Sequence, residues 1–93
     1  MTSTIWKYQL NSVGETIVTA PKPAAVRGVG PDVHNGGKEI CVWLEVVPDW
    51  TTTTRRFHVF GTGAEISLDK PLKHIGIVFQ EDMVFHVFEE FMR

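Results

Sequence analysis

The sequence predicts an all-β fold, either a small antiparallel sandwich or a partly open barrel of about six to seven strands. Short runs of β-forming residues recur along the chain, and turn-forming residues separate them at spacings of roughly 8–12 residues. No stretch of the chain shows a convincing helical period. The chain has 93 residues, a common length for one domain, so we expect a single domain over residues 1–93.

Glycine, proline and asparagine bound the first three expected strands. These strands comprise residues 4–10, 16–20 and 24–29. The first alternates apolar and polar residues, as a strand with one face in solvent does. The second ends at Pro21, because proline cannot donate a hydrogen bond to a ladder. Asn35-Gly36 follows the third strand and is typical of a tight hairpin turn, because both residues tolerate positive φ.

The remaining expected strands are more apolar. They comprise residues 38–47, 55–60, 75–79 and 84–88. Side chains alternate between the faces of a strand, so Ile75, Ile77 and Phe79 should share one face. A helical reading of residues 81–93 is less favourable, because valine, phenylalanine and histidine are weak helix formers. The last residues, 89–93, are expected to fray.

Three of these strands, at residues 40–47, 75–79 and 84–88, are apolar on both faces. A strand with one face in water is polar at alternate positions, so both faces of these strands need a cover. In so short a chain, another copy or a partner can supply the second cover. We therefore expect a homo-oligomer, with the second faces forming one continuous surface. The expected interface residues are Trp43, Trp50, Val84, His86 and Phe88.

Composition narrows the range of partners. The formal net charge is −2, and no basic stripe is present, which argues against a nucleic-acid partner. Cys41 is the only cysteine, so the chain cannot form an internal disulfide. The N-terminal segment has no long apolar run, so we expect neither a signal peptide nor a membrane span.

One segment has the composition of an anion site. Arg55 and Arg56 can bind phosphate or carboxylate through their guanidinium groups. Gly61-Thr62-Gly63 follows the same strand, and glycines let backbone N–H groups approach an anion. These five residues form the candidate ligand site, for a nucleotide-like molecule. The alternative is a strand end with a tight turn and solvated arginines, because the glycine spacing matches no nucleotide motif.

The sequence offers no catalytic constellation, metal site or cofactor site. Cys41 lies in the middle of a strand, where a thiol is usually buried and inert. The carboxylates lie in turns or near the C-terminus, and no acid–base pair can be assembled from them. His58 and His86 lie on strands, but no ligand spacing joins them, and nothing in the sequence forces a carboxylate to join them. We expect a protein that is not an enzyme and holds no metal.

Three blocks of the chain resemble one family. The blocks are Ile5-Trp6-Lys7-Tyr8 with Leu10, Arg55-Arg56-Phe57 with Gly61-Thr62-Gly63 and Ile66, and Ile75-Gly76 with Val84-Phe85-His86-Val87-Phe88-Glu89. They are similar to short proteins of tailed bacteriophages and prophages, notably of actinobacterial hosts. The resemblance implies a phage origin and a workplace in the host bacterial cytoplasm or in the virion. It supplies no catalytic residue and no cofactor.

These observations lead to one principal expectation and two alternatives. We expect a small phage binding protein that self-associates and antagonises a host factor or a defence pathway. One alternative is a sponge for a small anionic ligand, and the other is a minor structural protein of the virion.

Overall fold

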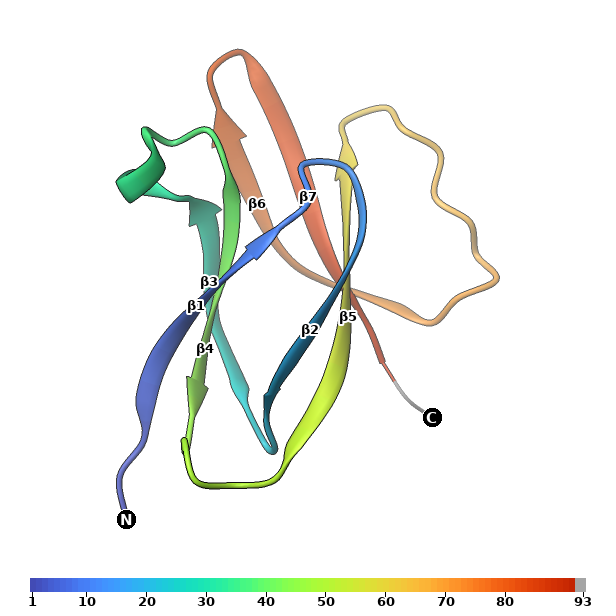
Figure 1. Ribbon diagram of the computed structural model, residues 1–93. Helices are drawn as coiled ribbons and strands as arrows, with labels where there is room; N and C mark the ends of the chain where they lie inside the picture. Colours follow the sequence, from blue (N-terminus) through green and yellow to red (C-terminus); the bar gives the residue numbers. More distant parts are fainter. Residues whose placement is uncertain (92–93) are drawn as a thin grey trace.

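The apolar runs pair into two antiparallel sheets (Figure 1). The computed structural model describes residues 1–91, apart from the side chain of Asn35. The first sheet has the order β1 (Thr4–Leu10), β4 (Ile40–Val46) and β3 (Ala25–Pro31). The second has the order β2 (Gly14–Pro21), β5 (Thr52–Gly61), β7 (Met83–Glu90) and β6 (Leu72–Gln80). The all-β prediction is confirmed, and the two sheets do not close into a barrel.

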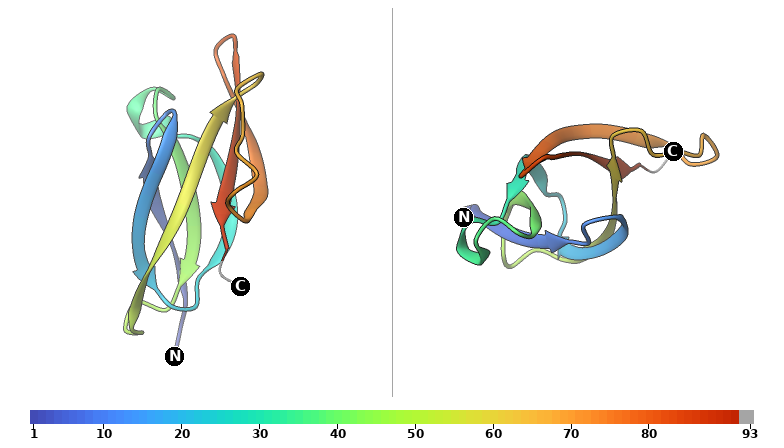
Figure 2. Two further views of the ribbon diagram at one scale, coloured as in Figure 1. Left: turned by 90° about the vertical axis from the view of Figure 1, so that its right-hand side faces the viewer. Right: turned by 90° about the horizontal axis from the view of Figure 1, so that it is seen from above.

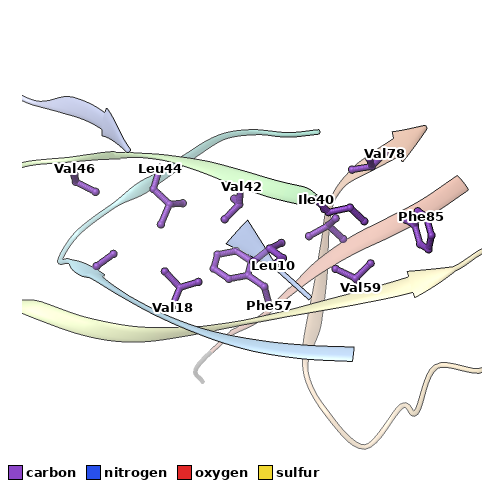
Figure 3. Packing of buried hydrophobic residues seen from close by; sticks show 12 residues of the cluster. Leu10, Val18, Ile40, Val42, Leu44, Val46, Phe57, Val59, Val78 and Phe85 are labelled. Carbon is purple, nitrogen blue, oxygen red and sulfur yellow. The ribbon is translucent and has the colours of Figure 1, made fainter. Parts of the chain in front are cut away.

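The core lies between the inner faces of the two sheets (Figure 3). Its side chains are Leu10, Val18, Ala20, Ile40, Val42, Leu44, Val46, Phe57, Val59, Val78, Phe85 and Val87. Phe85 and Val87 alternate with outward residues along β7, as the strand interpretation of this segment predicts. β7 continues through Glu89 and Glu90, which were expected to fray, whereas residues 92–93 lie outside the described part of the chain.

A bulge in β6 corrects one predicted face. The β6–β7 register shifts between His74 and Gly76, so Ile75 packs against the core. Ile77 and Phe79 lie on the outer face and are 44% and 71% exposed. An extra residue in one strand reverses the alternation beyond it, and sequence periodicity does not reveal such a residue.

The edge of β6 lies beside the edge of β3, as the view from above shows (Figure 2). A Cβ atom at Gly76 would lie 2.3 Å from Cγ2 of Val29, so only glycine fits this approach. At the end of the β6–β7 hairpin, Nε2 of Gln80 donates to the carbonyl oxygen of Gly37 at 2.5 Å. These contacts hold the hairpin against the first sheet.

The connection between β3 and β4 is longer than the predicted tight hairpin. The strands pair up to Pro31 and Ile40, and η1 (Val33–Asn35), a single 3-10 turn, lies between them. The tight turn predicted positive φ angles at residues 35 and 36. In the structure the positive φ angles are at Gly36 and Gly37, at 69° and 75°. No helix in residues 1–91 has the length and hydropathy required to cross a membrane.

Cys41 is fully buried, although it lies on the face of β4 opposite to the core residues of that strand. An ion pair lies in the same region, with Nζ of Lys7 at 3.0 Å from Oδ1 of Asp32. The Lys7 hydrogen bond lowers the pKa of Asp32 and keeps this carboxylate charged. Burial, followed by the nearby Asp32 charge, raises the pKa of the Cys41 thiol to about 11. The expected inert thiol is thus held in its neutral form at physiological pH.

Phe85→Ala tests which face of the closing hairpin is core. Phe85 is 5% exposed within a single copy, so we expect the truncation to lower the free energy of unfolding by about 3–5 kcal/mol. Phe91→Ala, at a residue 48% exposed and outside the core, is the matched control and should cost no more than about 0.5 kcal/mol. Urea denaturation followed by tryptophan fluorescence measures both. Equal small losses would mean that Phe85 lies outside the core.

The Cys41 thiol should not react with a disulfide reagent at pH 8 until the protein unfolds. Because the folded pKa is about 11, the unfolded chain releases this proton at lower pH than the folded chain. The Cys41 contribution to stability should therefore fall as the pH rises from about 9 to about 11. Cys41→Ala should remove that part of the decline. Rapid labelling of the native protein at pH 8 would contradict the burial.

Candidate functional site

The outer face of the four-stranded sheet combines aromatic and imidazole rings with aliphatic side chains. Its outward residues on β5, β6 and β7 form what we call the aromatic face: His58, Phe60, His74, Ile77, Phe79, Val84, His86 and Phe88. The register brings them together, because His58 pairs with Phe88 and Phe60 pairs with His86. On the other side, Phe79 pairs with Val84 and Ile77 pairs with His86.

The rings of the aromatic face contact one another across three strands. Phe60 meets Phe88 edge-on with centroids 5.6 Å apart, and His74 meets Phe88 in the same way at 5.0 Å. Nδ1 of His86 lies 3.3 Å from Nε2 of His74, and Nε2 of His86 lies 3.3 Å from Oγ1 of Thr62. These contacts hold the rings in a fixed arrangement, which lowers the entropy that a partner must remove on binding.

The expected interface residues lie in both sheets and in the turn that connects them. Val84, His86 and Phe88 lie together on the aromatic face and are half-buried. Trp43 belongs to β4 in the other sheet, where its ring lies 3.5 Å from the position that a Cβ of Gly30 would occupy. Trp50 lies in the turn between β4 and β5, and its amide donates to the carbonyl oxygen of Val47. The second faces of β4 and the closing hairpin therefore do not form one continuous surface.

The two arginines of the expected anion site point to opposite faces of β5. Arg55 lies on the inner face and makes a bidentate ion pair with Glu89, with Nη2 at 2.7 Å from Oε1. It also donates to the carbonyl oxygen of Ala24. Arg56 lies on the outer face, with Nη1 at 3.3 Å from Oε1 of Glu15. Both guanidinium groups thus have carboxylate partners.

The glycine segment lies six residues along β5 from Arg55, a separation of about 20 Å in an extended strand. The amide of Thr62 donates to the carbonyl oxygen of Val84, and the amide of Ala64 donates to that of Gly61. Gly63 has a φ of 92°, as a tight turn requires. The structure therefore does not bring Gly61, Thr62 and Gly63 together with the arginines.

A hollow of about 600 Å³ lies instead where β7 ends beside β5. Its lining residues are Lys22, Pro23, Ala24, Thr53, Thr54, Arg55, Arg56, Lys73, Glu89, Glu90 and Phe91. Four of them are cationic and two are acidic. The sequence pointed to the two arginines but not to Lys22 and Lys73, which come from distant segments and reach this place only through strand pairing.

A histidine and two glutamates form a second group, which the sequence did not predict. His58 is 7% exposed, and its Nε2 lies 3.1 Å from Oε1 of Glu90 and 3.7 Å from Oε2 of Glu15. Potential ligand atoms of these three residues all lie within 4.8 Å of one another. No sequence spacing could have indicated the group, because its members come from β2, β5 and β7.

Comparison with known proteins identifies the family. No curated protein and no solved structure matches the chain. One family description, a domain of unknown function designated DUF7352, matches residues 1–92. The match spans both sheets and every residue of the sites described above. The chain belongs to the DUF7352 family.

Proposed function

We propose that this protein is a non-enzymatic binding protein that self-associates through the aromatic face and in that form antagonises a factor of a bacterial host. The exposure of Ile77 and Phe79 beside the half-buried Val84, His86 and Phe88 is the observation that supports this function. Surface patches that are aromatic and poor in charge are typical of the centres of protein interfaces.

A second copy is the occupant that best fits this face. A two-fold interface uses the same patch on both subunits, so the patch must be complementary to itself. The aromatic face meets this requirement, because its residues include no aspartate, glutamate, lysine or arginine that could meet a like charge on the second copy. Glu81 and Asp82 form the adjoining turn and place charge at the rim, where interfaces are polar.

The host-directed part of the proposal rests on the resemblance to short phage proteins. The blocks that carry it include the Val84–Glu89 segment of β7, from which three side chains contribute to the aromatic face. A phage protein that works by binding acts in the host cytoplasm or in the virion. Binding to a host factor requires an accessible surface and no catalytic group, so in this proposal the factor contacts a part of the self-associated protein that the paired aromatic faces leave exposed.

Ile77→Ser tests the proposed self-association. The wild-type protein should sediment as a dimer or larger species at micromolar concentration, and the variant should shift towards monomer, with a dissociation constant raised by about tenfold or more. Ile5→Ser is a matched control, because Ile5 is a strand residue of the other sheet and is 54% exposed. Analytical ultracentrifugation distinguishes these outcomes. A wild-type protein that remains monomeric at 100-fold higher concentration would refute self-association.

A second candidate function is the capture of a small anion in the hollow beside Arg55. The excess of cationic over acidic lining residues favours this function. The pairing of Arg55 with Glu89 sets its limit, because an anion must compete with that carboxylate for the guanidinium. Lys22 and Lys73 are the cationic residues of the hollow that can bind such a ligand without breaking the Arg55–Glu89 pair or the Arg56–Glu15 pair.

A nucleotide panel tests the hollow by thermal unfolding. A nucleotide at about 100 times its dissociation constant should stabilise the folded protein by about 2.7 kcal/mol. Lys73→Gln should weaken this stabilisation, whereas Lys38→Gln, at an exposed residue outside the hollow, should leave it unchanged. The absence of stabilisation by every nucleotide would remove this second function and leave the aromatic face unaffected.

A further inference from the structure

We propose that Glu15, His58 and Glu90 bind a divalent transition-metal ion of the zinc type. This site goes beyond the binding function proposed above. It uses a buried imidazole and two carboxylates that the core does not require.

The sheet supplies one ligand from each of three adjacent strands. Glu15 on β2 pairs directly with His58 on β5. Glu90 on β7 pairs with Arg56, two residues from His58 on the same face of β5. Residues two apart on a strand point to the same side, so all three side chains project from the outer face of the sheet. Ligands on paired strands are held more rigidly than ligands on loops.

The distances suit a tetrahedral ion. Ligand bonds of about 2.0–2.1 Å imply ligand–ligand separations of about 3.4 Å in a tetrahedral zinc site. Nε2 of His58 lies 3.1 Å from Oε1 of Glu90 and 3.7 Å from Oε2 of Glu15. All the ligand atoms lie within 4.8 Å of one another, so rotation of the more exposed Glu15 side chain closes the set. Three protein ligands leave a fourth position for water or for a group from another molecule.

The surroundings orient the histidine. His58 is 7% exposed, and its ring lies parallel to that of Phe60, with centroids 6.3 Å apart and an interplanar angle of 8°. A buried ring with fixed orientation directs Nε2 at the two carboxylates. Metal-binding histidines need such orientation, because only one lone pair of the ring is available to the ion.

Two cations offset the carboxylate charge without enclosing it. Nη1 of Arg56 lies 3.3 Å from Glu15, and Nζ of Lys70 lies 4.0 Å from Glu90. Their side chains are 46% and 54% exposed, so both can move into solvent when an ion arrives. One nitrogen and two oxygen ligands suit zinc, cobalt or nickel, whereas magnesium and calcium prefer oxygen ligands alone.

The aromatic face also contains a pair of imidazoles, His74 and His86, which is the competing place for an ion. His58, Phe88 and His74 lie on successive strands, so His74 is about 10 Å from His58 across two strand spacings. An ion at the pair and an ion at the proposed site therefore depend on different residues. Substitutions at each place distinguish the two.

Isothermal titration of the full-length protein with zinc chloride tests the site, with the absorption spectrum of bound cobalt as an independent readout. The wild-type protein should bind one equivalent, with a tetrahedral cobalt spectrum. Substitution of residues that hydrogen-bond to metal ligands typically lowers metal affinity by about 10–100-fold. Removal of a direct ligand, in His58→Gln or Glu90→Gln, should therefore weaken zinc binding by at least about 100-fold. Glu90→Gln retains the buried ring and serves if His58→Gln does not fold.

His34→Gln is the control. His34 lies in the exposed η1 turn, so its substitution should leave zinc affinity unchanged. His86→Gln should also leave it unchanged. Two results would overturn the proposal: no zinc binding by the wild-type protein at millimolar concentration, or binding that is lost in His86→Gln and retained in the folded Glu90→Gln variant.

Discussion

The register between β5 and β7 is the constraint on which the rest of the structure depends. Val59 and Val87 lie opposite each other, and both are fully buried. That pair fixes which side chains of the two strands face inward, because successive side chains along each strand point to opposite faces of the sheet. A slip of one residue would bury His86 and Phe88 and expose Phe85. The Arg55–Glu89 pair, the contact of His58 with Glu90 and the part of the aromatic face on β5 and β7 all follow from this alignment.

The same register determines on which face of the sheet the charged side chains at the ends of β5 and β7 lie. Arg55 and Glu89 point inward at the end of the core, where their bidentate pairing makes the partial burial of both groups tolerable. Glu90 points outward to His58. Two neighbouring glutamates in one sequence segment therefore have different roles: Glu89 balances the inner arginine, and Glu90 contacts the buried His58 on the outer side of the sheet.

Local chemistry was sufficient to predict the strands and the fold class. Proline, glycine and asparagine mark the breaks, and the apolar content of β4 and β7 indicated that neither sheet face is plainly solvated. Sequence periodicity did not reveal the bulge at His74–Gly76, which moved Ile77 and Phe79 outward. It also did not reveal that Trp43 and Phe88 belong to different sheets, because strand order depends on pairing between distant segments. Lys22, Lys73, Glu15 and Glu90 were missed as site residues for the same reason.

The most direct test of this account is the β5–β7 register in solution. Nuclear Overhauser contacts measured on the labelled protein report which side chains face one another across the two strands. We expect contacts between the methyl groups of Val59 and Val87 and between the rings of His58 and Phe88, because directly opposite side chains lie about 5 Å apart. Contacts from Val59 to His86 or Phe88 in place of Val87 would place a different set of residues on the outer face and contradict the account.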